Sequence, residues 1–118
     1  MGPSIIDLFQ RGVVDHQAGR LLQAQAAYRQ ILTIDPAHAD AHNNLGIALG
    51  GLGRPAEAEA SFREALRLRP NYPEAHNNLG NALRDLGRPA EAEASYREAL
   101  RLRPNFPGAH NNPRLCAG

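Results

Sequence analysis

The sequence of 118 residues has the length of one domain, and we expect no room for a second, catalytic domain. Thirteen basic residues, all of them arginine, and twelve acidic residues give a formal net charge of +1, so no net field would draw the chain to nucleic acid or to an acidic membrane. The single cysteine, Cys116, excludes an internal disulfide, and no apolar run approaches the roughly 20 residues that span a bilayer. We therefore expect a cytoplasmic protein without membrane insertion.

Apolar residues follow a helical period in three pairs of stretches. The predicted helices lie at about 4–17 and 20–33, at 39–51 and 55–68, and at 73–85 and 89–102. Within a pair, a glycine such as Gly53 follows the first helix and a proline such as Pro55 opens the second. Between pairs, Pro70 and Pro73 cannot donate a backbone hydrogen bond and must interrupt the helix. The sequence therefore predicts antiparallel helical hairpins that stack.

The three pairs are copies of one unit. Residues 39–72 and 73–106 align without a gap over 34 positions and differ at only seven columns. A diverged copy occupies 5–38, and an incomplete fourth begins at 107 and runs to 118. We predict an all-α fold, an α-solenoid of stacked antiparallel helical hairpins, in a single domain spanning 1–118.

The repeated residues resemble the tetratricopeptide repeat (TPR) family, whose units of 34 residues carry Leu-Gly, a later Ala, an aromatic residue and a Pro. The match covers about residues 5–106, and in the second unit it includes Leu45-Gly46, Ala58, Phe62 and Pro70. The resemblance implies a protein-protein interaction scaffold without enzymatic activity. It also implies that a peptide or protein segment binds in a concave groove lined by the first helix of each hairpin.

Two glycines within predicted helices need a packing reason. Gly46 and Gly80 each cost about 1 kcal/mol of helix stability relative to alanine. We expect them to face the small residues Ala58 and Ala92, so that the two helices of a hairpin approach closely.

The two similar units diverge mainly along one stripe of the first helix. Asp40, Ile47, Gly50 and Gly51 differ from their partners in the next unit, and this stripe also carries asparagines. Either the stripe is a tailored ligand surface or its solvent-facing positions drift freely. The candidate peptide-binding residues are Asn43, Asn44, Ile47, Asn77, Asn78, Asn81, Arg84, Asp85, Phe9 and Val13.

Asn44, Asn78 and Asn112 recur every 34 residues and would form a ladder of amides along the groove. An amide both donates and accepts, so it can pair with the main chain of an extended peptide. The ladder resembles the one in the repeat region of O-linked N-acetylglucosamine transferases, and only its binding role could apply here. Alternatively each asparagine bonds a neighbour or a helix backbone, an interpretation that we favour more for Asn43 and Asn77.

Two further features of the groove bear on its ligand. Chaperone-adaptor members of the family hold a terminal carboxylate with basic side chains, whereas Arg84 is the only basic residue at the corresponding sites here, so such a clamp is not expected. Phe9, Val13 and Ile47 could form an apolar pocket, or Phe9 and Val13 could instead shield the first hairpin.

No catalytic, metal or cofactor site is expected. His42 and His76 recur with the repeat and are interpreted as packing residues, and His38 with His42 lacks an evident third ligand. Ser61 has no basic partner placed to activate it. Glutamates interleave with the arginines of the second helices, which argues against nucleic acid as a partner.

The solenoid lacks a convincing terminal helix, because Pro113 replaces the leucine expected in the fourth copy. We therefore expect leucines of the last hairpin to be partly exposed, and the chain to form homo-oligomers through this hairpin. The expected leucines are Leu79, Leu83, Leu86 and Leu100. A self-assembling structural unit is accordingly the alternative function.

Overall fold

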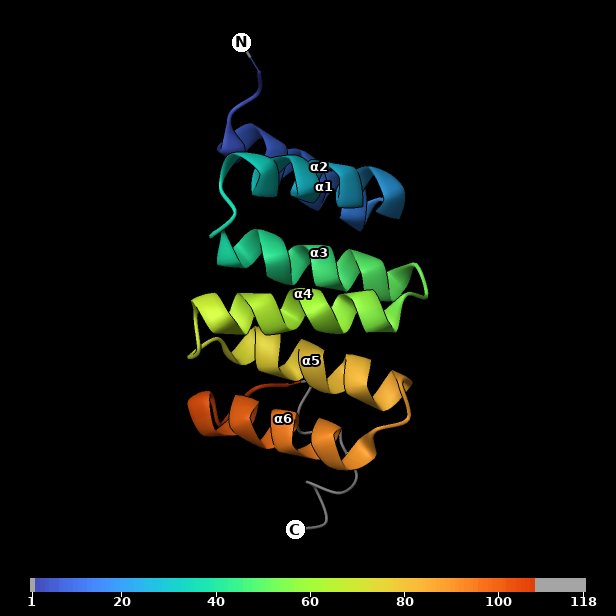
Figure 1. Ribbon diagram of the computed structural model, residues 1–118, viewed down its shortest axis with the longest axis vertical. Coiled ribbons are helices and arrows are strands. Elements are labelled where there is room, and N and C mark those ends of the chain that lie inside the picture. Colours follow the sequence, from blue (N-terminus) through green and yellow to red (C-terminus); the bar gives the residue numbers. More distant parts are fainter. Residues whose placement is uncertain (1, 108–118) are drawn as a thin grey trace.

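The computed structural model describes residues 2–107, and helices are its regular secondary structure there. The helices are α1 (Ile5–Gln17), α2 (Leu21–Ile34), α3 (Ala39–Gly51), α4 (Pro55–Leu68), α5 (Pro73–Asp85) and α6 (Pro89–Leu102). Figure 1 shows them stacked in chain order along the long axis of a molecule that measures 53 × 25 × 21 Å. The predicted all-α fold is confirmed, and the predicted helix bounds match for α3 to α6 and differ by one residue at ends of α1 and α2.

Each hairpin turns at a glycine that no other residue type would replace without strain. Gly53 has φ of 74° and Gly87 has φ of 76°, a left-handed conformation that favours glycine. The backbone N–H of Arg54 donates to the carbonyl of Leu49, and the N–H of Gly53 to that of Gly50, both over 3.0 Å. This pair of bonds is a Schellman motif, which satisfies the last carbonyls of α3 before Pro55 opens α4.

A polar contact fixes the link between the second and third hairpins. Tyr72, just before α5, donates its hydroxyl to Asp40 Oδ1 in the first turn of α3 over 2.7 Å. The Arg69 guanidinium lies 3.1 Å from the same oxygen and 4.4 Å from the centre of the Tyr72 ring. Burial would raise the pKa of Asp40, but the hydrogen bonds from Tyr72 and Arg69 outweigh it and lower that pKa.

The core is a continuous layer between paired helices, and it corrects the expected role of the helical glycines. A Cβ on Gly46 would lie 2.5 Å from Phe62 Cε1, and one on Gly80 would lie 2.7 Å from Tyr96 Cε1. The glycines therefore admit an aromatic ring of the second helix, rather than facing Ala58 or Ala92 as we expected. The same arrangement recurs in the first hairpin, where Gly12 faces Tyr28.

The exposed apolar residues lie on the first hairpin, not on the last as predicted. Leu79 and Leu83 are only 4% and 1% exposed, so their predicted exposure is wrong, while Leu86 and Leu100 are half-buried. Leu79 and Leu83 belong to the core cluster that runs through all three hairpins. The large hydrophobic residues that are exposed within the described part of the chain are Ile6, Val14, Leu22 and Ile34.

Candidate functional site

The first helices of the second and third hairpins, α3 and α5, contact one another directly, and their asparagines make the link. Asn78 Nδ2 donates to Asn43 Oδ1 over 3.1 Å, across one repeat boundary. Asn43 is only 4% exposed, whereas Asn78 is half-buried at the surface of the groove. The buried Asn43 therefore orients the side chain of Asn78. This agrees with the interpretation that asparagines at the position of Asn43 bond a neighbouring residue.

Two more amides are held by tyrosine hydroxyls. Asn44 Nδ2 lies 3.5 Å from the hydroxyl of Tyr28, and Tyr96 donates its hydroxyl to Asn81 Oδ1 over 2.5 Å. Burial raises the pKa of both tyrosines, so both hydroxyls are protonated at neutral pH. Sequence spacing does not reveal these tyrosine contacts, because each one joins residues on two different helices.

Asn77 occupies the column of Asn43 in the last hairpin. It is 7% exposed, and its Oδ1 is the buried side-chain polar atom within residues 2–107 that has no hydrogen-bond partner. Its counterpart Asn43 accepts from Asn78 of the following helix. Asn112 is the counterpart of Asn78 one repeat later. It lies outside the described residues, as do His110 and Cys116.

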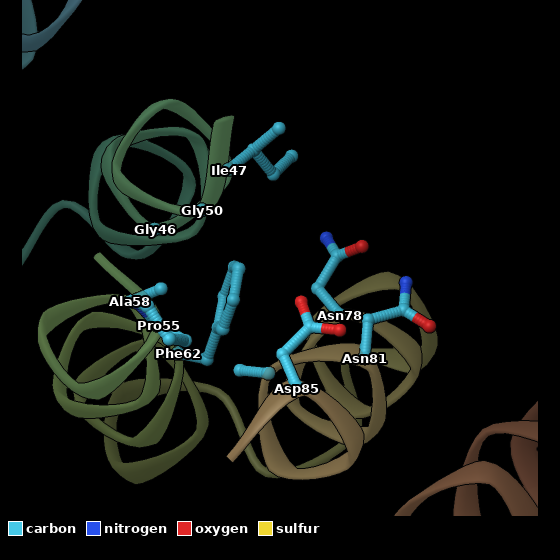
Figure 2. A pocket seen from close by; sticks show the side chains of 10 residues that line it. Gly46, Ile47, Gly50, Pro55, Ala58, Phe62, Asn78, Asn81 and Asp85 are labelled. Carbon is cyan, nitrogen blue, oxygen red and sulfur yellow. The ribbon is translucent and has the colours of Figure 1, made fainter. Parts of the chain in front are cut away.

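A pocket of about 180 Å³ opens in the groove between α3, α4 and α5. Figure 2 shows Phe62 rising from α4 between the other two helices, with Ile47 on the α3 side and Asn78, Asn81 and Asp85 on the α5 side. Its lining is completed by Gly46, Gly50, Pro55, Ala58 and Ala82. We call this site the α3–α5 pocket; it brings together four of the predicted binding residues.

The other predicted residues lie elsewhere. Phe9 packs edge-on against Tyr28 at 6.0 Å and stacks on His38 at 5.7 Å, and it lines a separate surface pocket between α1 and the start of α3. Val13 lines neither that pocket nor the α3–α5 pocket. The structure therefore does not bring Phe9, Val13 and Ile47 together in either of these two pockets.

The α3–α5 pocket carries one charged residue, Asp85. The Arg84 guanidinium is 3.9 Å from its carboxylate and points outside the lining, with both side chains more than half exposed. The groove beside the pocket therefore has no cluster of cations. The remaining arginines of the described chain pair mainly with glutamates of the second helices, as between Arg63 and Glu59 at 2.9 Å.

The histidines have structural partners at helix starts. His38 caps α3 by accepting from the backbone N–H of Ala41 over 3.0 Å, and His42 lies 2.9 Å from the carbonyl of Pro36. Within residues 2–107, no group of three potential metal ligands is arranged around a common point. In the same part of the chain, no helix is both long and apolar enough to cross a bilayer.

Comparison with known proteins decides the family. The family described as "Tetratricopeptide repeat" matches residues 10–73 and 45–109, which together cover most of the chain. The chain belongs to the tetratricopeptide repeat family. No curated protein sequence matches it.

Several solved TPR structures are similar to this fold. The first TPR of Spaghetti (RPAP3), bound to the HSP90 peptide SRMEEVD, has a TM-score of 0.90 at 26% identity and covers 96% of this chain and 90% of its own. The Thermobaculum terrenum O-GlcNAc transferase has a TM-score of 0.87 at 30% identity, and the match covers 93% of this chain but 22% of that protein. The Sgt2 TPR domain from Aspergillus fumigatus, at 21% identity and a TM-score of 0.90, matches 98% of this chain and 78% of its own and shows the shared fold alone.

Proposed function

We propose that this TPR protein is a non-catalytic interaction module that binds an extended peptide segment in the groove formed by α1, α3 and α5. The amides of Asn44, Asn78 and Asn81 lie along this groove, and the α3–α5 pocket lies among them. A similar TPR domain has an HSP90 peptide bound, which supports a peptide as the class of ligand. With one cysteine in its sequence, the chain suits a reducing, cytoplasmic setting.

The observation that carries the proposal is the orientation of Asn78. Its Nδ2 is fixed on Asn43 Oδ1, and its Oδ1 accepts no hydrogen bond from any residue between 2 and 107. An oriented acceptor at the groove surface can receive a peptide N–H whatever the side chain of that peptide residue is. Asn43 and Asn77 support the groove from below, while Asn44, Asn78 and Asn81 make the contacts.

The groove favours neutral or basic segments over acidic ones. The peptide of the RPAP3 complex, SRMEEVD, carries three acidic side chains. Here Arg84 lies 3.9 Å from Asp85 beside the pocket, and no cation is in the pocket lining. We therefore expect no tight binding of an acidic C-terminal tail.

A selection from a phage-displayed library of short peptides tests the function. Affinities of selected peptides are measured by calorimetry against the wild type, Asn78→Ala, and Gln23→Ala on the exposed face of α2 as control. We expect Asn78→Ala to weaken binding about tenfold, the value of one or two oriented hydrogen bonds, and Gln23→Ala to have no effect. Unchanged affinity in Asn78→Ala, or no selectable peptide, would reject the groove.

Self-assembly by end-to-end stacking is the second candidate function, and a specific observation favours it. Val14 on α1 is 56% exposed, whereas its counterparts Ala48 and Ala82 on α3 and α5 are buried. In the last described hairpin, Asn77 Oδ1 has no donor among residues 2–107. Stacking α1 of one copy on the last hairpin of the next would cover both surfaces.

Analytical ultracentrifugation tests this assembly. Val14→Glu places a charge in the proposed contact and should leave only monomers, whereas Glu57→Gln on α4 should not change the distribution. Asp7 holds the column of buried Ala41 and Ala75, so Asp7→Ala should strengthen association. A wild-type chain that stays monomeric at high concentration would exclude this candidate.

A further inference from the structure

The positions that line the α3–α5 pocket carry different side chains in the first hairpin, next to α3. In the first hairpin, the column of Gly50 holds His16 and the column of Pro55 holds Leu21. Leu21 reaches across to α3, where its Cδ1 lies 2.9 Å from the Cβ position of Gly51. In the third hairpin, Arg84 replaces Gly50. In the second hairpin, the small residues Gly50 and Pro55 at these positions leave the pocket open.

Gly50 has no packing reason to be glycine. A Cβ on Gly46 would lie 2.5 Å from Phe62, but a Cβ on Gly50 would have no neighbouring atom within 4 Å. Gly50 lies inside α3, where glycine is the least favourable residue apart from proline. Glycine therefore weakens the helix at this point and leaves an opening beside the pocket.

Phe62 contributes a second, independent feature. In the other two hairpins its column holds tyrosines, whose hydroxyls meet Asn44 and Asn81. Shifted by one repeat, the Tyr28–Asn44 contact corresponds to Phe62 and Asn78, and the Tyr96–Asn81 contact corresponds to Phe62 and Ile47. A hydroxyl on Phe62 would therefore point toward Asn78 or Ile47, which line the pocket. Phenylalanine keeps this wall apolar and leaves Asn78 without a tyrosine partner.

The differences between the two otherwise similar repeats are concentrated at this pocket. Of the seven differing columns, four place a residue in its lining: 47/81, 50/84, 51/85 and 62/96. The pocket volume of about 180 Å³ is comparable with the roughly 150 Å³ of an engineered apolar cavity that holds benzene. Its lower wall is apolar and its mouth carries Asn78, Asn81 and Asp85.

We propose that the α3–α5 pocket accepts one aliphatic side chain of leucine size from the bound peptide, and that Gly50 and Phe62 determine this specificity. The inference rests on the proposed peptide-binding function and names its anchor. Asn78 Oδ1 accepts the N–H of the anchored residue. Asn81 Nδ2 donates to its carbonyl, since Asn81 Oδ1 is already occupied by Tyr96.

The test uses N-acetyl-leucine methylamide, which offers one side chain between two peptide groups, and its alanine analogue. Both are titrated into the whole chain while NMR follows the Ile47 methyl groups and the Asn78 and Asn81 side-chain amides. We expect saturable shifts at these groups with the leucine compound and at least about tenfold weaker binding of the alanine compound. No saturable shift, or equal binding of the two compounds, would overturn the proposal.

Gly50→Leu and Phe62→Tyr are the decisive variants, with Ala26→Leu on the exposed face of α2 as a control of equal bulk. Gly50→Leu should fill the opening, raise the melting temperature by a few degrees and abolish the shifts. Phe62→Tyr should weaken binding several-fold, and Ala26→Leu should not affect it. Binding that persists in folded Gly50→Leu would overturn the anchor. If phage-selected peptides still depend on Asn78 in that case, the groove function stands without it.

Discussion

Asn78 and Asn43 form a 3.1 Å hydrogen bond that joins consecutive repeats. The same column in the next repeat holds Asn77, which is also buried, but its Oδ1 has no donor within residues 2–107. Two buried asparagines at equivalent positions thus differ in hydrogen bonding. The pair offers an internal measure of what the repeat-to-repeat bond contributes.

Asn43→Ala should destabilise the fold more than Asn77→Ala. The first change removes a made hydrogen bond and the second removes an unpaired acceptor, so the free energies of unfolding should differ by about 1 kcal/mol. Urea denaturation of both variants measures this difference. Equal losses would mean that the Asn43–Asn78 bond adds nothing to stability.

Gly46→Ala should lower stability although alanine favours helices. Its Cβ would meet the Phe62 ring at 2.5 Å, and overpacking typically costs about 1–3 kcal/mol, more than the gain in helix propensity of about 1 kcal/mol. Gly50→Ala in the same helix is the matched control, because a Cβ on Gly50 would have no neighbouring atom within 4 Å. It should stabilise the protein by up to about 1 kcal/mol, and opposite signs in thermal denaturation are the expected signature.

The Asp40 contact predicts a pH dependence. The pKa of Asp40 is lowered in the folded chain by Tyr72 and Arg69, despite its partial burial, so its stabilising effect is complete above the unfolded value of about 3.9 and is lost as the pH falls through the lower folded value. The stability difference between wild type and Asp40→Asn should therefore stay constant from pH 7 to about pH 5 and shrink below about pH 4. A constant difference for Asp40→Asn would contradict the assignment.

Glu59 links two hairpins and should be sensitive to salt. Its carboxylate lies 2.9 Å from both Arg63 and Arg88. Burial would raise the pKa of Glu59, but the hydrogen bonds from the two arginines outweigh this effect and lower it. Glu59→Gln should cost up to about 1 kcal/mol at low salt and less at high salt. Gln25 holds the same column one repeat earlier, near Arg54, so Gln25→Glu should give a small gain that salt also removes. Denaturation at two ionic strengths checks both variants.

The helices were predictable because local signals determine them. Gly53 and Gly87 need left-handed φ values, and Pro55 and Pro89 start helices, so each turn is encoded where it occurs. The repeat then placed every hairpin by analogy, which requires no knowledge of tertiary contacts. The fold was therefore predicted nearly in full.

The site was predictable only in part, because it depends on contacts between repeats. Ile47, Asn78, Asn81 and Asp85 were candidates from their pattern, and the structure gathers them around one pocket. Sequence spacing could not show that Phe62, sixteen residues after Gly46, would place its ring against that glycine. It also could not show that Gly50 adjoins open space, because that depends on how the other helices pack around α3.

The large contacts of the stack join helices that follow one another in the chain, with α3 and α5 as an added link. Such a molecule has no single closing seam, so it can open from an end one unit at a time. The first hairpin, with its exposed apolar side chains, could detach while α3 to α6 stay paired. Partial melting would then remove α1 from the stack and leave the α3–α5 pocket intact.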